Sequence, residues 1–243
     1  MKNKNYYYEN EYFNIGYNKY DITSSSFNVS SHIHDLYEIY YFLKGDVTYY
    51  IEGQGYKIEK DDLLIINSRE LHKPIFNSNL PYERIVIHFI PWYISKFNSE
   101  SFDLLNCFEN RSLGKNNKIP NSRIKKYSID KKFKDIIKYV KNNQDESEIM
   151  LETLFIQLLI SLNNIFNNKE SINNNFVEYN ENTLKIINFI NDNLEKKITL
   201  DLLANEFFLD KYYLSHLFKK NTGFSVIQYV NYKKIMKAKG IAE

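Results

Sequence analysis

The segment ITLDLLANEFFLDKYYLSHLFKKNTG, residues 198–223, determines how the carboxyl-terminal part of this chain folds. Thr199 is placed to cap a short helix, and Asp210 is placed to cap a second helix that stops at Gly223. The apolar positions predicted to face inward on the two helices are Leu202, Leu203, Phe207, Tyr213, Leu214, Leu217 and Phe218. Two short amphipathic helices joined by a tight turn are typical of a helix-turn-helix.

Helices are also predicted on both sides of this segment. Residues 183–195 carry apolar side chains at helical spacing, and Ser225 is placed to open a long helix through VIQYVNYKKIMKAK. The polar positions of the second short helix share the face opposite its apolar residues. These positions are Lys211, Tyr212, Ser215, His216 and Lys219. Such a face either binds DNA or is simply solvated.

About sixty carboxyl-terminal residues closely resemble the first helix-turn-helix of the AraC/XylS family of bacterial transcription regulators. The resemblance rests on LA in the first short helix, on YLSHLFKKNTG, on SVIQYV and on the basic KKIMKAK. It implies that Lys211, Tyr212, Ser215 and His216 face the major groove of promoter DNA and that Lys219 contacts phosphate. The family often has Arg where this chain has His216, so base preference or affinity is expected to differ.

The resemblance also implies a second helix-turn-helix after the long helix. The sequence stops at KAKGIAE, residues 237–243, where that unit would begin. We therefore expect a regulator that lacks the second of its two helix-turn-helix motifs, as in a truncated gene product, a fragment or a disrupted copy. Such a chain is expected to bind DNA weakly and with a shallow salt dependence.

The amino-terminal part, to about residue 92, predicts strands. Apolar residues alternate over short runs such as VTYYIEG, YKIEKDDLLIIN and ERIVIHFI, and glycine and NSNLP turns separate them. Many short strands without a long helical repeat favour a sandwich or small barrel. The resemblance to the AraC/XylS family implies that residues 1–125 form a cupin-like β-barrel, which is followed by helices, so the predicted fold class is α+β.

The segment HIHDLYEIYYFLKG, residues 32–45, closely resembles the first sequence signature of cupins. The resemblance implies that His32, His34 and Glu38 lie on the inner wall, joined by His72 from INSRELHKP. In a metal-bearing cupin these residues hold a first-row transition metal. We expect no metal and no cofactor here. Instead, the same four residues and Tyr40 are predicted to line an effector pocket. His88 is interpreted as a satisfied core histidine without a role.

Residues 126–170 predict a helical dimerisation segment. A broad apolar stripe includes Leu151, Leu154, Phe155, Leu158 and Leu162, and it is wider than packing on one face of a barrel requires. This favours a homodimer, although burial within one chain remains the alternative. Residues 171–181 are polar and predict a linker, and residues 182–243 form the helix-turn-helix domain.

Charge and cysteine content restrict the location. Residues 181–243 hold ten Lys and seven Asp or Glu, a net of +3, against −1 for the preceding residues. A mildly basic tail is compatible with nucleic acid binding. Cys107 is the only cysteine, and we find no apolar run of signal-peptide or membrane-span length. We therefore expect a cytoplasmic protein without a membrane partner.

Taken together, these features predict a non-enzymatic transcription regulator. Its partners would be promoter DNA, a small-molecule effector such as a sugar, a second copy of the chain, and RNA polymerase. The alternative is a cupin metalloenzyme, an oxygenase or isomerase, with a vestigial helical tail.

Overall fold

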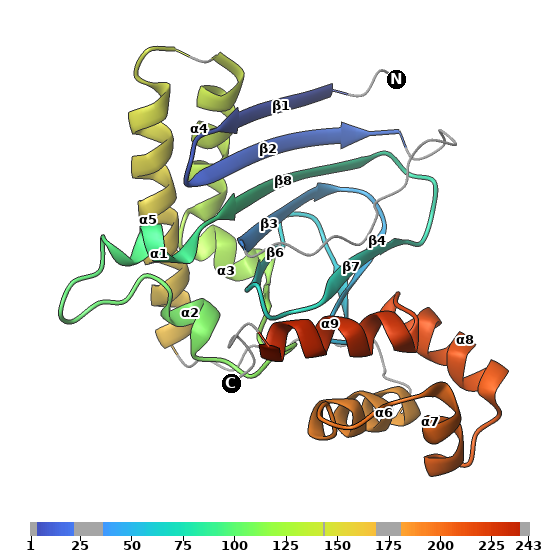
Figure 1. Ribbon diagram of the computed structural model, residues 1–243. Helices are drawn as coiled ribbons and strands as arrows, with labels where there is room; N and C mark the ends of the chain where they lie inside the picture. The colour runs from blue at the N-terminus through green and yellow to red at the C-terminus, as the bar shows by residue number, and fades with distance from the viewer. Residues whose placement is uncertain (1–3, 22–35, 143, 169–180, 239–243) are drawn as a thin grey trace. The chain divides into compact units, whose positions relative to one another are not determined.

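The computed structural model describes residues 4–21, 36–142, 144–168 and 181–238 (Figure 1). Contacts divide the chain into two compact units. The first comprises residues 1–47, 58–68 and 76–174, and the second comprises 48–57, 69–75 and 175–243. Our sequence-based boundaries at 125, 170 and 181 follow the motifs, whereas the second unit joins strands from the first half of the chain to the carboxyl-terminal helices. The predicted linker, 171–181, lies almost entirely outside the described residues.

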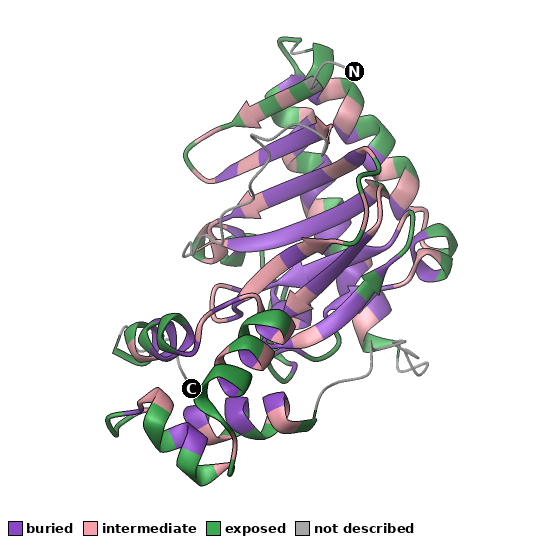
Figure 2. Cartoon of the chain, turned by 90° about the vertical axis from the view of Figure 1, so that its right-hand side faces the viewer, coloured by how far each residue is buried: buried purple, intermediate pink, exposed green. Residues whose placement is uncertain are grey.

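The first unit contains a six-stranded antiparallel sheet. Its order is β1 (Lys4–Glu9), β2 (Phe13–Tyr20), β8 (Tyr82–Phe89), β3 (Tyr37–Lys44), β6 (Leu63–Ile66) and β9 (Lys118–Ile119). Six of the eight β3 residues are buried, because β3 lies in the middle of the sheet and its apolar and aromatic side chains are covered on both faces. Figure 2 shows this as nearly continuous burial along the central strands.

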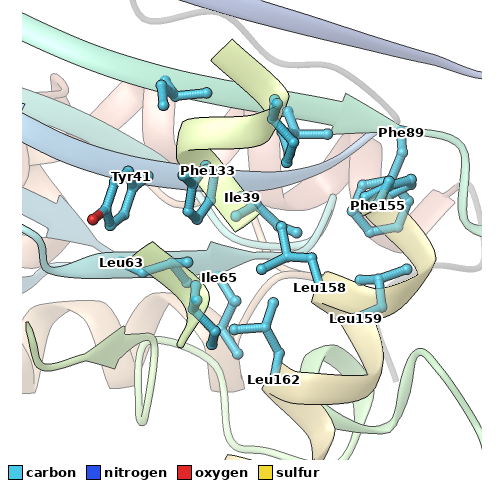
Figure 3. Close-up of a cluster of buried hydrophobic side chains, with 14 of the residues drawn as sticks. Ile39, Tyr41, Leu63, Ile65, Phe89, Phe133, Phe155, Leu158, Leu159 and Leu162 are labelled. Carbon is cyan, nitrogen blue, oxygen red and sulfur yellow. The ribbon is translucent and has the colours of Figure 1, made fainter. Parts of the chain in front are cut away.

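The described residues of the first unit form five helices. They are α1 (Pro91–Ser95), α2 (Asn106–Glu109), α3 (Asn121–Lys126), α4 (Ile129–Asn142) and α5 (Ser147–Asn167). Helices α4 and α5 form an antiparallel pair that covers one face of the sheet (Figure 1). The strands supply Ile39, Tyr41, Leu63 and Ile65 to this core, as Figure 3 shows. Tyr41 stacks on Phe133 of α4 with ring centroids 4.1 Å apart.

Helix α5 is buried where we predicted an interface between two chains. Leu151, Phe155, Leu158 and Leu162 are completely buried in the core of their own unit, and Leu154 is 7% exposed. The alternative of burial within one chain therefore accounts for these five side chains, and the homodimer stays a prediction. We predicted no run of membrane-span length, but by length and composition alone α5 could cross a membrane. Most of its apolar side chains, although not Ile149 and Ile160, belong to the core described above.

In the part of the second unit that the structure describes lie most of a three-stranded sheet and four helices. The sheet order is β5 (Gln54–Ile58), β4 (Val47–Ile51) and β7 (His72–Phe76). The helices are α6 (Glu181–Asp192), α7 (Leu200–Glu206), α8 (Lys211–Thr222) and α9 (Val226–Ala238). Their shared core includes Leu71 from the segment before β7 together with Ile186, Leu214 and Phe218.

The α+β class and the sheet-rich amino-terminal half are as predicted, but the closed barrel is not. Within the described residues the strands form two separate sheets, and β1 and β9 are the edges of the larger one. Strand β9 has only two residues and pairs only with Leu63 and Leu64 of β6, so it does not extend the sheet toward closure.

Candidate functional site

One face of the six-stranded sheet packs on α4 and α5, and the opposite face carries polar side chains. Since side chains alternate along a strand, Glu38 and Tyr40 project away from the helix-covered side that holds Ile39 and Tyr41. On β8 the residue paired with Glu38 is His88, so it shares this face. The face is nonetheless largely buried at its centre, where Glu38 is 3% exposed and Tyr40 is 0% exposed.

A chain of three hydrogen-bonded side chains crosses β3, β8 and β2 on this face. Glu38 Oε2 lies 3.1 Å from His88 Nε2, and His88 Nδ1 lies 3.1 Å from Asn14 Oδ1. The strand register brings them together, because His88 is opposite both Glu38 and Asn14. The cluster therefore places a carboxylate, an imidazole and an amide side by side across three strands, a set of groups that can form hydrogen bonds with a polar ligand.

A second cluster lies on the same face. The hydroxyls of Tyr40 and Tyr82 are 3.0 Å apart, and the Arg84 guanidinium lies 5.8 Å and 5.6 Å from the centres of the two rings. Burial raises the pKa of Tyr82, and the opposing effect of the Arg84 charge is smaller. Tyr82 therefore keeps its hydroxyl proton at neutral pH and can donate a hydrogen bond. The face thus offers both signs of charge together with phenol donors.

The predicted pocket residues fall in different places. Glu38 and Tyr40 lie together on the polar face of β3, whereas His32 and His34 lie outside the described residues. His72 is on β7 in the second unit, where its Nδ1 donates to the Glu70 carbonyl at 2.8 Å and its ring stacks on Tyr49. Across the described ranges no three His, Cys, Asp or Glu side chains gather as metal ligands would.

Sequence reasoning left His88 without a role, and it missed Arg84 and Tyr82. His88 is hydrogen-bonded, as we expected, but one of its partners is Glu38, which places it in the candidate site. The alternation in ERIVIHFI does put Arg84 and His88 on one face. The alternation does not show which strand lies beside β8, and the neighbouring strand decides which residues Arg84 and His88 contact.

A surface cavity of about 340 Å³ elsewhere in this unit, lined by residues 99–103, Asn106 and Asn167, contains none of the predicted residues.

The other candidate surface is the outer face of α8. The Asp210 carboxylate caps this helix by accepting hydrogen bonds from the Tyr212 and Tyr213 amides at 2.9 and 3.0 Å. Gly223 ends it with a φ of +80°, as predicted. Thr199 likewise caps α7, accepting from the Leu202 amide at 3.1 Å. Each of these caps satisfies backbone groups that the helix itself leaves unpaired.

The five α8 residues predicted to meet DNA lie on one side of the helix. Lys211, Tyr212, His216 and Lys219 are exposed, and Ser215 is half-buried. The opposite side carries Leu214 and Phe218, which are completely buried. Two positions predicted to face inward are more open, since Tyr213 is 50% exposed and Leu202 of α7 is 37% exposed. Lys211 forms an ion pair with Asp201 of α7.

Residues 20–159 match the AraC-like ligand binding domain family. No curated protein matches this chain.

Solved structures that resemble the chain have low identity. An RmlC-like cupin with a double-stranded β-helix fold from Methanocaldococcus jannaschii shares 15% identity at a TM-score of 0.30, over 36% of this chain and 80% of that one. An apo ToxT variant from Vibrio cholerae shares 13% identity at a TM-score of 0.41, over 91% and 98%. A salicylate 1,2-dioxygenase from Pseudaminobacter salicylatoxidans shares 15% identity at a TM-score of 0.31, and this chain spans 28% of its length.

Proposed function

Because the chain belongs to the AraC-like ligand binding domain family, we propose that it is a ligand-responsive transcription regulator and not an enzyme. In this proposal the polar face of the six-stranded sheet takes a small molecule, and the outer face of α8 binds promoter DNA. A second copy of the chain and RNA polymerase are its proposed partners, and the cytoplasm is its proposed location.

The observation that carries the proposal is the exposure of α8. A capped helix with Lys211, Tyr212, His216 and Lys219 exposed on one side presents a positive, hydrogen-bonding ridge of the width that a major groove admits. In the proposed roles, Lys211, Tyr212, Ser215 and His216 meet base edges, and Lys219 meets phosphate. Lys211 would exchange its ion pair with Asp201 for DNA, which lowers the net gain from that contact.

The ligand-binding half of the proposal rests on the chemistry of the sheet face. Two hydrogen-bonded pairs, Glu38 with His88 and Tyr40 with Tyr82, supply donors and acceptors on this one face. A small molecule with several hydroxyl groups, such as a sugar, would satisfy these groups.

The test of DNA binding uses the full chain and random-sequence duplex selection, followed by binding isotherms at several salt concentrations. Lys211→Ala together with His216→Ala should abolish sequence preference, and Lys219→Ala should weaken binding to all sequences and reduce the salt slope by about one. Lys185→Ala on α6 is the matched control, because Lys185 is an exposed lysine of the same unit that forms an ion pair with Glu181, one helical turn away. Equal losses in Lys185→Ala and Lys219→Ala would contradict the assignment of α8.

The metalloenzyme alternative has a separate test. Its ligands would be Glu38, His72, His32 and His34, of which the last two lie outside the described residues. Glu38 is hydrogen-bonded to His88, and His72 donates to a backbone carbonyl. Elemental analysis of protein purified without chelators decides the matter, since near-stoichiometric iron or manganese would favour the enzyme over the regulator.

A further inference from the structure

The β4–β5 turn contains an acidic residue in a backbone conformation that normally belongs to glycine or asparagine. Glu52 and Gly53 form a two-residue hairpin loop, with φ values of +47° and +78°. This pair of positive φ angles is typical of a type I′ turn, in which Asn or Gly is preferred at the first position. Glutamate is therefore locally disfavoured here, and such an outlier is a reason to look for a function.

The Glu52 carboxylate is buried and fully engaged inside the second unit. Its Oε1 accepts a hydrogen bond from the Leu71 amide at 2.7 Å. Its Oε2 accepts from the Tyr229 hydroxyl at 3.0 Å and lies 2.6 Å from Lys233 Nζ. Glu52 and Lys233 are each only 6% exposed. A buried charge is tolerated only when it is paired and hydrogen-bonded, as both charges are here.

A second polar contact joins the same strands to the same helices. Lys73 of β7 donates from Nζ to the Gly223 carbonyl at 3.1 Å, at the carboxyl end of α8. A lysine is favourable there because the last carbonyls of a helix carry partial negative charge.

These contacts connect two parts of the sequence. Glu52, Leu71 and Lys73 lie within residues 20–159, which match the ligand-binding family, whereas Gly223, Tyr229 and Lys233 follow that match. The ring of Tyr229 also packs edge-on against Phe218, with centroids 5.5 Å apart. Phe218 lies on the buried side of α8, behind the face that we propose to bind DNA. The side chain of Tyr229 thus links the hairpin turn, through its hydroxyl, to the buried side of α8, through its ring.

We propose that Glu52 is a positioning residue for DNA binding. By holding Tyr229 and Lys233 of α9, it fixes the orientation of α8 relative to the strands of the ligand-binding domain within the second unit. A ligand that displaces the β4–β5 hairpin would therefore change how α8 is presented. The effect on DNA binding rests on the proposed function, but the role of Glu52 in holding α9 and orienting α8 does not.

The experiment compares full-length Glu52→Asn, Lys233→Met and the double variant. Asparagine suits the left-handed turn but is too short to reach α9. Each single change leaves one buried charge unpaired, so the thermal midpoint should fall in both. The double variant removes both charges, so its midpoint should recover most of the loss. Its DNA affinity should nevertheless stay at least about tenfold below that of the unmodified chain, because the contact is still missing.

Hydrogen exchange supplies the readout that does not need DNA. Amides of α8 and α9 should exchange at least about tenfold faster in the double variant than in the unmodified chain. Asp61→Asn is the matched control, since Asp61 is another acidic turn residue with positive φ and bonds Tyr41 in the first unit. It should change none of these quantities in α8 and α9.

Two outcomes would overturn the inference. One is full recovery of both thermal midpoint and DNA affinity in the double variant, which would make Glu52 merely structural. The other is unchanged exchange in α8 and α9. If the unmodified chain binds no DNA, the proposed function fails, while exchange still decides the role of Glu52. Should the charge variants not fold, Tyr229→Phe removes only the hydroxyl and should accelerate α9 exchange in the same direction.

Discussion

Cys107 reports on opening of the first unit because it is the only cysteine and is completely buried. Its amide donates to Asn163 Oδ1 at 2.9 Å, which ties α2 to α5. Burial raises the pKa of the Cys107 thiol to about 12. At a given pH, such a thiol holds about a thousandth of the thiolate of an ordinary cysteine.

We expect a thiol reagent at pH 8 to modify Cys107 only when the unit unfolds. The labelling rate should rise with denaturant in parallel with the unfolded fraction, and Leu158→Ala should accelerate it. Mass spectrometry of the intact chain over time measures the rate. Rapid labelling in native buffer, at the rate of a free thiol, would contradict the burial of this residue.

Gly223 meets two separate constraints. Its φ of +80° suits glycine, and a Cβ atom there would lie 2.5 Å from Lys73 Cδ. Gly223→Ala should therefore lower the free energy of unfolding by about 1–3 kcal/mol. In a Lys73→Ala background the collision disappears and only the backbone strain remains, so the alanine should be less damaging. Urea denaturation of the four variants measures this, and identical effects in both backgrounds would exclude the collision.

At the scale of helices and strands, short sequence signals were sufficient to predict the helix ends, because a helix end depends on the chemistry of a few neighbouring residues. The caps at Thr199 and Asp210 and the stop at Gly223 could be read directly. Ser225 also opens α9 as predicted, through reciprocal hydrogen bonds with Gln228. By contrast, the pairing of Glu38 with His88 depends on two strands 50 residues apart in sequence becoming neighbours, which no local pattern encodes.

Helix α5 illustrates a second limit. Its apolar stripe predicts that a face is buried, but it does not say whether the partner is the same chain or another one. Here the leucines meet β3, β6 and α4 of their own unit (Figure 3). The sequence alone does not show how large an area of the sheet is available to cover these leucines.

We expect the two sides of α5 to respond differently to truncation. Leu158→Ala should lower the free energy of unfolding by about 2–5 kcal/mol because it leaves a cavity in the core. Ile160, which is 39% exposed, should lose less than about 0.5 kcal/mol on replacement by Ala. Chemical denaturation measures both. If Ile160→Ala instead alters the oligomeric state in light scattering, the exposed side of α5 is the dimer face.

For the whole molecule, the domain boundaries drawn from motifs and the units drawn from contacts differ for a physical reason. The core around α6–α9 includes Leu71. In the same unit, Glu52 supplies the carboxylate that pairs with buried Lys233. A motif search finds the helices because their signals are contiguous. It does not find two short strand segments that complete the same unit from more than a hundred residues away.

A fragment that begins at residue 175 should accordingly be less stable than the same helices in the full chain. It would lack Leu71 and leave Lys233 without Glu52. Circular dichroism should give a lower melting temperature and a broader transition for the fragment. A fragment that melts as cooperatively as the full chain, and at the same temperature, would show that the strands contribute nothing to the helical core.

The long separation between Glu52 and Tyr229 also has a consequence for synthesis on the ribosome. The two residues are 177 positions apart. At about 5–20 residues per second, roughly 10–35 s pass between their translation. During that interval the β4–β5 hairpin has emerged while α9 does not yet exist, so the Glu52 carboxylate stays in water and the disfavoured turn has little to hold it. The nascent second unit is therefore open to chaperones and proteases until α9 leaves the exit tunnel.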